Sequence, residues 1–102
     1  MEKNDKKVGL LFNTQKPEAI EMAWRLWRWG KENGVHFLLP PHEASAIALP
    51  EVTDETWRKE VSFAVILGGD GTFLRAARYI FGSDVPLYGI NLGRLGFLPI
   101  GN

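Results

Sequence analysis

Residues 64–81 read AVILGGDGTFLRAARYIF, and the fold expected for the chain follows from this stretch. A run of buried-type residues, 64–67, predicts a short strand, and a helical pattern follows it directly. Between them, three glycines occupy four positions: Gly68, Gly69 and Gly71. A glycine-rich turn before a helix leaves main-chain N–H groups free, and the helix dipole there favours negative charge. The stretch therefore predicts a place where phosphate can bind.

The segments on either side continue the alternation of strands and helices. Strands are expected over residues 8–12, 35–39, 64–67 and 86–90, and helices over 17–33, 44–49, 53–59 and 71–81. Continuous apolar strands in this alternation indicate a parallel sheet covered by helices. The expected fold is a Rossmann-like or flavodoxin-like open α/β sheet with helices on both faces. Ligands of such sheets bind beyond the carboxyl ends of the strands, where loops 13–16, 68–72 and 91–96 are expected.

The carboxylate of Asp70 is unusual in a phosphate-binding turn, because a fixed negative charge repels phosphate. The simplest interpretation makes Asp70 the helix N-cap, accepting a hydrogen bond from the N–H of Phe73. Each glycine lowers the stability of the fold by about 0.5–1 kcal/mol where alanine could take its place. A helix cap does not explain three such glycines. Close approach of a ligand does. The alternative is that Asp70 receives the proton of an attacking hydroxyl during phosphoryl transfer.

Two familiar phosphate-binding loops do not fit the turn. A Walker-type loop has Gly-Lys-Ser or Gly-Lys-Thr after its glycines, whereas Gly71 precedes Thr72 and Phe73. A dinucleotide fingerprint starting at Gly69 would have its third glycine at Leu74. The turn is thus neither an ordinary NTPase loop nor an ordinary dehydrogenase loop.

A second glycine-rich motif, GINLGRLGFL, covers residues 89–98. It reads either as a flexible loop after a strand or as a shaped wall, since its glycines alternate with large apolar residues. Arg94 in this motif lies where its guanidinium could meet phosphate.

Together, GGDGTFLRAAR and PLYGINLGRLGFL resemble NAD kinase, the enzyme family that phosphorylates NAD to NADP. The GGDGT element alone is shared with diacylglycerol and sphingosine kinases and, in similar form, with phosphofructokinases. The NLGRLGFL segment selects NAD kinase. The resemblance implies that residues 1–102 are the α/β N-terminal domain of a two-domain kinase, whose active site a β-rich C-terminal domain completes.

The resemblance also implies roles for particular residues and ligands. Asp70 would act on the 2′-hydroxyl of the adenosine ribose of NAD, with ATP or polyphosphate as donor and Mg²⁺ bound to that donor. No residue of this chain is expected to be a dedicated metal ligand. The residues expected to bind phosphate are Gly68, Gly69, Gly71, Thr72 and Arg94, and those expected to contact NAD are Asp70, Gly71, Leu74 and Phe97.

Two alternatives to NAD kinase stay open. One is a lipid or sugar kinase that shares GGDGT, and the other is a non-catalytic nucleotide-binding module. The phosphoryl donor and the preference for NAD over NADH are open as well.

Composition limits the other classes of function. The 102 residues suit one domain, and 12 basic and 12 acidic residues leave no footprint for nucleic acid or an anionic membrane. Cysteine is absent, and no apolar run is long enough for a signal peptide or a membrane span. A cytoplasmic location is expected. Because the sequence stops just after the glycine-rich segment, we expect it to be a piece of a longer protein.

Three further features complete the expectations. Arg75 and Arg78 are expected on a solvated helix face, with phosphate contact the less favoured alternative. His36 is expected within the sheet, and His36 and His42 lack metal-ligand spacing. Helix 17–33 carries an unusually wide apolar arc, which predicts either tryptophans packed on the sheet or a second contact, with another chain or with the missing domain. Of these contacts we expect self-association into a homo-oligomer through Trp24 or Trp29.

Overall fold

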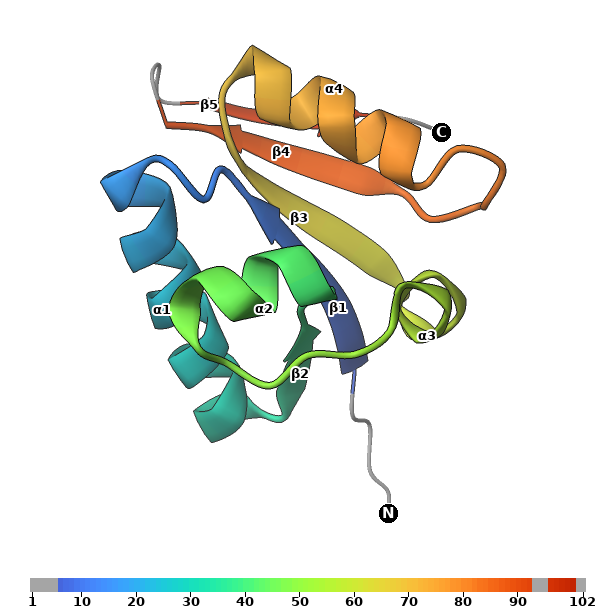
Figure 1. The fold of residues 1–102 in the computed structure, drawn as a ribbon. Helices are drawn as coiled ribbons and strands as arrows, with labels where there is room; N and C mark the ends of the chain where they lie inside the picture. Colours follow the sequence, from blue (N-terminus) through green and yellow to red (C-terminus); the bar gives the residue numbers. More distant parts are fainter. Residues whose placement is uncertain (1–5, 93–95, 101–102) are drawn as a thin grey trace.

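The computed structural model describes residues 6–92 and, by main chain alone, 96–100 (Figure 1). The elements follow one another as β1 (Lys6–Phe12), α1 (Pro17–Asn33), β2 (Val35–Leu38), α2 (Pro41–Ile47), α3 (Asp54–Glu60), β3 (Phe63–Gly68), α4 (Asp70–Tyr79), β4 (Leu87–Asn91) and β5 (Gly96–Ile100). The expected alternation of strands and helices is confirmed.

One sheet contains all five strands, in the order β2-β1-β3-β4-β5. Strands β1 to β4 run parallel, as expected, and β5 runs antiparallel to β4, with Pro99 opposite Tyr88. The sequence did not predict β5, since glycines and a proline obscure its strand pattern. Proline lacks the N–H that a central strand requires, and the position of β5 at the sheet edge accommodates Pro99.

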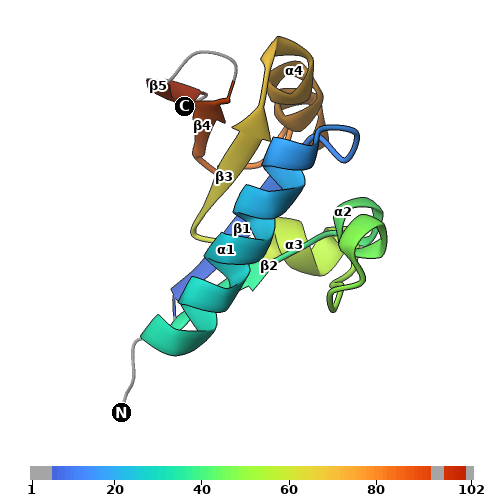
Figure 2. The same ribbon diagram turned by 90° about the vertical axis from the view of Figure 1, so that its left-hand side faces the viewer.

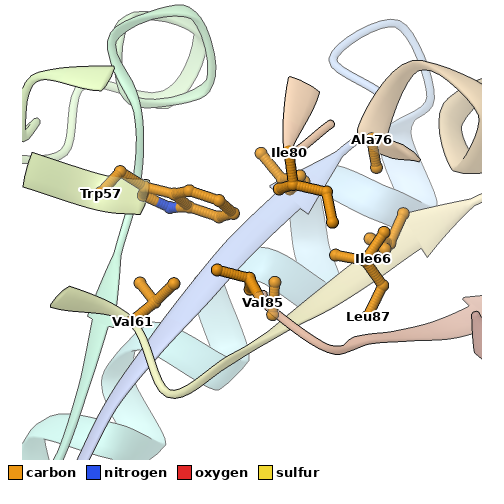
Figure 3. Close-up of a cluster of buried hydrophobic side chains, with 9 residues drawn as sticks. Trp57, Val61, Ile66, Ala76, Ile80, Val85 and Leu87 are labelled. Atoms are coloured by element: carbon orange, nitrogen blue, oxygen red, sulfur yellow. The ribbon is translucent and has the colours of Figure 1, made fainter. Parts of the chain in front are cut away.

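Helices cover both faces of the sheet, and the side chains of β1 alternate between them. Leu10 and Phe12 pack in one core with Ala19 and Ala23 of α1, and Figure 2 shows α1 lying across β1 and β2. Leu11 belongs to the opposite core, which α3 and α4 cover. Figure 3 labels members of that second core: Trp57, Val61, Ile66, Ala76, Ile80, Val85 and Leu87. The predicted α/β fold with helices on both faces is therefore confirmed.

Helix α1 has the predicted bounds. It begins at Pro17, whose fixed φ suits a first turn, and it ends at Gly34, which adopts φ 75°. Only small residues of α1 are fully buried, Ala19, Ala23 and Gly30. A Cβ on Gly30 would lie 2.7 Å from Cδ2 of Phe37, so the helix packs closely on β2. This close packing leaves Trp24 and Trp29 on the outside, whereas Trp27 is partly buried against the core.

The shorter helices differ from the predicted bounds. Helix α2 begins at Pro41 rather than residue 44, because proline is favoured in a first helical turn. Helix α3 begins at Asp54, and Oγ1 of its N-cap, Thr53, accepts a hydrogen bond of 3.1 Å from the N–H of Thr56. Helix α4 begins at Asp70 and ends at Tyr79, two residues before the predicted end. Within the described part of the chain, no helix is long and apolar enough to cross a bilayer.

Candidate functional site

The sheet reverses its direction of winding between β1 and β3. From β1 the chain passes to β2 on one side, and from β3 to β4 on the other. In open parallel sheets, ligands bind outside the carboxyl ends of the strands at this switch point. A hollow of about 370 Å³ lies here, lined by the loop after β1, the start of α4 and His42 of α2. Three of the predicted phosphate-binding residues line it: Gly69, Gly71 and Thr72.

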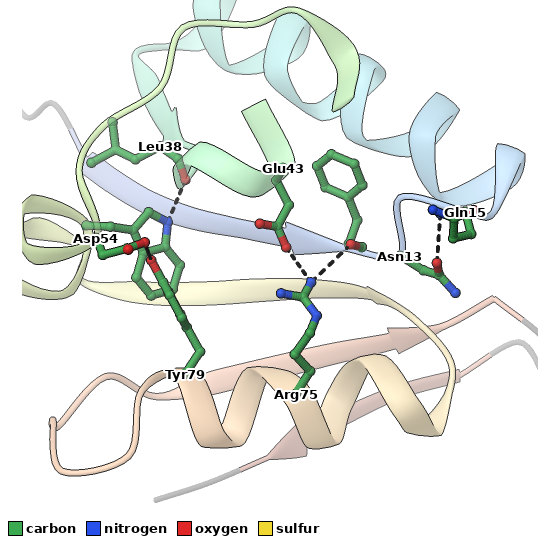
Figure 4. Close-up of polar contacts among 9 residues, drawn as sticks. Asn13, Gln15, Leu38, Glu43, Asp54, Arg75 and Tyr79 are labelled. Carbon is green, nitrogen blue, oxygen red and sulfur yellow. Dashed lines mark hydrogen bonds and ion pairs between the residues drawn. The ribbon is translucent and has the colours of Figure 1, made fainter. Parts of the chain in front are cut away.

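The loop after β1 is fixed beside the end of β3. Asn13 donates its N–H to the carbonyl of Leu67 at 3.0 Å, which ties the loop to β3. The Oδ1 of Asn13 accepts from the N–H of Gln15 at 2.8 Å, closing the turn (Figure 4). One wall of the hollow is therefore held by the strand that carries the glycine-rich turn.

Gly68 is required by close packing at the end of β3. A Cβ at Gly68 would lie 2.6 Å from Oγ1 of Thr72, which is buried, and the φ of Gly68 is 157°. Gly68 is not among the residues that line the hollow. Within the described structure, its role is to let Thr72 pack against the strand.

Gly69 and Gly71 differ from Gly68, since a Cβ at either would meet nothing within 4 Å. Gly69 is the N-cap of α4, and its carbonyl accepts from the N–H groups of Thr72 and Phe73, each at 3.1 Å. The N–H groups of Asp70 and Gly71, in the first turn, have no acceptor within their own helix. Packing in the described chain therefore leaves open space at two of the three glycines.

Asp70 is the first residue of α4 and is exposed. The interpretation of Asp70 as the N-cap is wrong, because the cap is Gly69 and no side chain caps this helix. The carbonyl of Gly69 accepts the Phe73 N–H that an Asp70 cap would have used. The carboxylate is therefore accessible from solvent, beside the residues that line the hollow.

Arg75 is exposed, as predicted, and its guanidinium is also held by two acceptors. Its Nη2 donates to Oε2 of Glu43 at 2.5 Å and to the carbonyl of Phe12 at 3.4 Å (Figure 4). Arg75 also lines the hollow. Arg78, one turn later, is exposed as predicted.

Glu43 was missed by the sequence analysis, although it is almost fully buried, at 1% exposed. Its Oε1 has no hydrogen-bond partner among the described residues. The available signal was spacing, since Glu43 lies one helical turn before the apolar Ile47 and shares its buried face.

The predicted NAD-contacting residues are only partly described. Leu74 is 60% exposed and follows Asp70 by four residues, which places both on one face of α4. Arg94 and the side chain of Phe97 lie outside the described residues. The main chain of Phe97 pairs with Ile90 in β5. His36 lies in β2, as expected, and the described part of the chain contains no group of three potential metal ligands.

Fold and hollow together define a doubly wound α/β domain with a candidate ligand site at its switch point. Residues 8–101 match the family model described as the ATP-NAD kinase N-terminal domain. The chain therefore belongs to the NAD kinase family, as the sequence motifs had indicated.

Relatives named NAD kinase align with most of the chain. The one from Heliobacterium modesticaldum is 37% identical over 94 residues, covering 89% of this chain and 32% of the relative. The one from Chloroherpeton thalassium is 39% identical over 93 residues, covering 90% of this chain and 32% of the relative. The one from Aromatoleum aromaticum is 37% identical over 102 residues, covering 96% and 34%. The chain thus spans about a third of the length of these relatives.

Proposed function

We propose that this chain forms part of the active site of an NAD kinase. The reaction transfers a phosphoryl group from ATP or polyphosphate to the 2′-hydroxyl of the adenosine ribose of NAD, giving NADP. One observation carries the proposal. Asp70, the first residue of α4, is exposed and its carboxylate does not cap the helix, and it lies beside a hollow lined by Gly69 and Gly71. Membership of the NAD kinase family supports the choice of substrates.

In this proposal Asp70 acts on the attacking hydroxyl. Its carboxylate accepts a hydrogen bond from the 2′-hydroxyl and takes the proton as the new P–O bond forms. The bond between the transferred phosphorus and the leaving oxygen of the donor breaks, and the donor keeps that electron pair. The N–H groups at the start of α4 bind phosphate oxygens, and the helix dipole favours their negative charge.

Mg²⁺ enters with the phosphoryl donor as part of the substrate. Magnesium prefers oxygen ligands and is commonly held by substrate phosphates plus one or two carboxylates. The donor's phosphates would supply its main ligands, in keeping with the expectation that no residue of this chain is a dedicated metal ligand. The ion would neutralise charge on the phosphates during transfer.

Further parts of the proposal come from the sequence expectations. Thr72 and Arg94 would contact phosphate together with the glycines, and Leu74 and Phe97 would line the adenine side of NAD. A β-rich C-terminal domain would complete the site. The cytoplasmic location expected from the sequence stays a prediction.

We also propose that two copies associate through Trp24 or Trp29 of α1. Trp24 and Trp29 are 37% and 51% exposed, and the residues that α1 buries against the sheet are small. Exposed tryptophans on one helix are typical of contact surfaces.

The substitution Asp70→Asn in the full-length polypeptide that carries this segment tests the proposed function. It keeps the side-chain shape and removes the proton acceptor, so we expect kcat for NADP formation to fall by about 100-fold or more. Asp84→Asn, at another exposed aspartate, is the matched control and should leave kcat unchanged. Near-normal turnover by the Asp70 variant would remove Asp70 from this role.

A substrate panel separates the alternatives. The wild-type full-length polypeptide is assayed with NAD, diacylglycerol and fructose 6-phosphate, with ATP or polyphosphate as donor. Phosphorylation of NAD alone supports the proposal, and turnover of a lipid or sugar supports a different GGDGT kinase. Tight binding of NAD and ATP without any turnover would support the binding module.

A further inference from the structure

The ion pair between Arg75, which lines the hollow, and Glu43 joins α4 to α2. Its two partners differ sharply in environment: the Arg75 side chain is 43% exposed and the Glu43 side chain only 1%. A buried carboxylate thus holds a guanidinium that remains accessible from the hollow. Figure 4 shows Glu43 pointing from α2 toward Arg75.

Stability alone does not explain this pair. Removing a carboxylate from water is unfavourable, and apolar side chains of similar volume often stabilise a fold as well as a buried ion pair does. For Glu43 the free-energy cost of leaving water is increased, because its Oε1 has no hydrogen-bond partner among the described residues. A function for the arginine that Glu43 holds would explain why a carboxylate occupies this position.

The geometry leaves Arg75 with unused donors. An arginine side chain has five N–H groups, of which Nη2 carries two. The described contacts of Arg75 use Nη2 alone, one to Glu43 and one to the carbonyl of Phe12. Three N–H groups, on Nη1 and Nε, therefore have no acceptor among the described residues.

We propose that Glu43 is a positioning residue and that the arginine it holds, Arg75, binds a phosphate group in the hollow. The inference rests on the proposed function and deepens it. A planar guanidinium held in one orientation can donate two parallel hydrogen bonds to phosphate oxygens. Both the polyphosphate chain of the donor and the pyrophosphate of NAD offer this chemistry.

The first test uses Glu43→Met in the full-length polypeptide. Methionine keeps approximate volume without a buried charge, so the fold is expected to survive. Loss of orientation at Arg75 should raise one KM about tenfold, the effect of losing one charge-assisted hydrogen bond. A higher KM for ATP assigns the phosphate to the donor, and a higher KM for NAD assigns it to the acceptor. Unchanged values of both would overturn the inference.

Two further variants keep the test decisive if Glu43→Met does not fold. Glu43→Gln retains an oxygen that can accept from Arg75, and its KM values should stay within about threefold of wild type. Arg75→Lys retains the charge but loses the planar fork, and should raise the same KM about tenfold. Arg78→Gln, an exposed arginine on the same helix, is the matched control and should change neither KM. A tenfold effect in that control, or none in Arg75→Lys, would contradict the proposal.

A double-substitution cycle establishes whether Glu43 acts through Arg75. If it does, Glu43→Met should cause no further increase in KM when Arg75 has already been replaced by methionine. Independent effects would multiply instead, and that result would overturn the positioning role.

Binding of tripolyphosphate, measured by calorimetry at constant salt, separates this inference from the proposed function. If the wild-type polypeptide forms no NADP, the proposed activity fails, and binding still decides the role of Arg75. Binding about tenfold weaker in Glu43→Met than in wild type supports the inference. Equal binding in both, or none in wild type, overturns it.

Discussion

The indole ring of Trp57 lies directly against the main chain of Gly9. A Cβ added at Gly9 would be 2.7 Å from Cε2 of Trp57, closer than atoms in a packed core can approach. Trp57 is fully buried, and its Nε1 donates to the carbonyl of Leu38 at 2.8 Å. The ring is therefore fixed over the paired strands β1 and β2, and the absence of a side chain at Gly9 makes room for it.

Gly9→Ala should destabilise the chain, because the added methyl group displaces the indole or the strand. Overpacking of this kind lowers the free energy of unfolding by about 1–3 kcal/mol. Urea denaturation followed by circular dichroism measures the change. Gly71→Ala is the matched control, since its added Cβ meets nothing within 4 Å. Equal stability of the two variants would contradict the packing shown for Trp57.

Gly71→Ala should separate folding from ligand binding. Gly71 lies in the first turn of α4 with open space at its Cβ position, so alanine should raise the free energy of unfolding by about 0.4–1 kcal/mol. If phosphate approaches the main chain here, the same methyl group should weaken ATP binding about tenfold, which corresponds to 1.4 kcal/mol. Thermal denaturation and calorimetric titration measure the two effects. Unchanged affinity would show that the ligand does not approach Gly71.

Tyr79→Phe should change how stability responds to alkaline pH. Burial and a hydrogen bond to Asp54 raise the pKa of Tyr79 above its ordinary value of 10.0. Above about pH 10 the unfolded chain loses this proton while the folded chain keeps it, so the free energy of unfolding falls as pH rises. Phenylalanine should lower stability by about 0.5–1.5 kcal/mol at neutral pH and make the alkaline decrease shallower.

Denaturation series between about pH 8 and pH 11 measure this response. Tyr88→Phe, which removes the other tyrosine of the chain, is the control and should leave the alkaline decrease in place. An identical pH profile in Tyr79→Phe and wild type would contradict the assignment to Tyr79.

Trp29→Glu should prevent association of two copies through α1. A charge at the most exposed tryptophan of this helix would have to be desolvated in a contact between copies. Sedimentation velocity over a range of concentrations should show dimers of wild type and monomers of the variant. Phe81→Glu, at an exposed phenylalanine after α4, is the control. Monomeric wild type at high concentration would rule out the proposed association.

The fold was predictable where local pattern and tertiary packing agree. Helix α1 has proline at its start and glycine at its end, and both bounds were predicted. Strand β5 was not predicted, because glycine and proline are poor strand residues. Its strand conformation depends on tertiary pairing with β4, which places Pro99 in an edge strand.

The candidate site was predictable only in part. The glycine-rich turn was found from sequence, because strand, glycines and helix are contiguous there. The pair of Glu43 and Arg75 was not, since 32 residues separate them and folding alone brings them together. Asp70 was found, but the competing interpretation as a cap could be rejected only from the position of Gly69.

Apart from His42 of α2, the residues that line the hollow belong to segments that follow two central, adjacent strands, β1 and β3. A chain in which these strands have not paired has no such hollow, so its ligands bind the native state and not the unfolded ensemble. Ligand at 100 times its dissociation constant would then stabilise the native state by about 2.7 kcal/mol. Occupancy by substrate would in this way protect the whole domain against thermal inactivation and proteolysis.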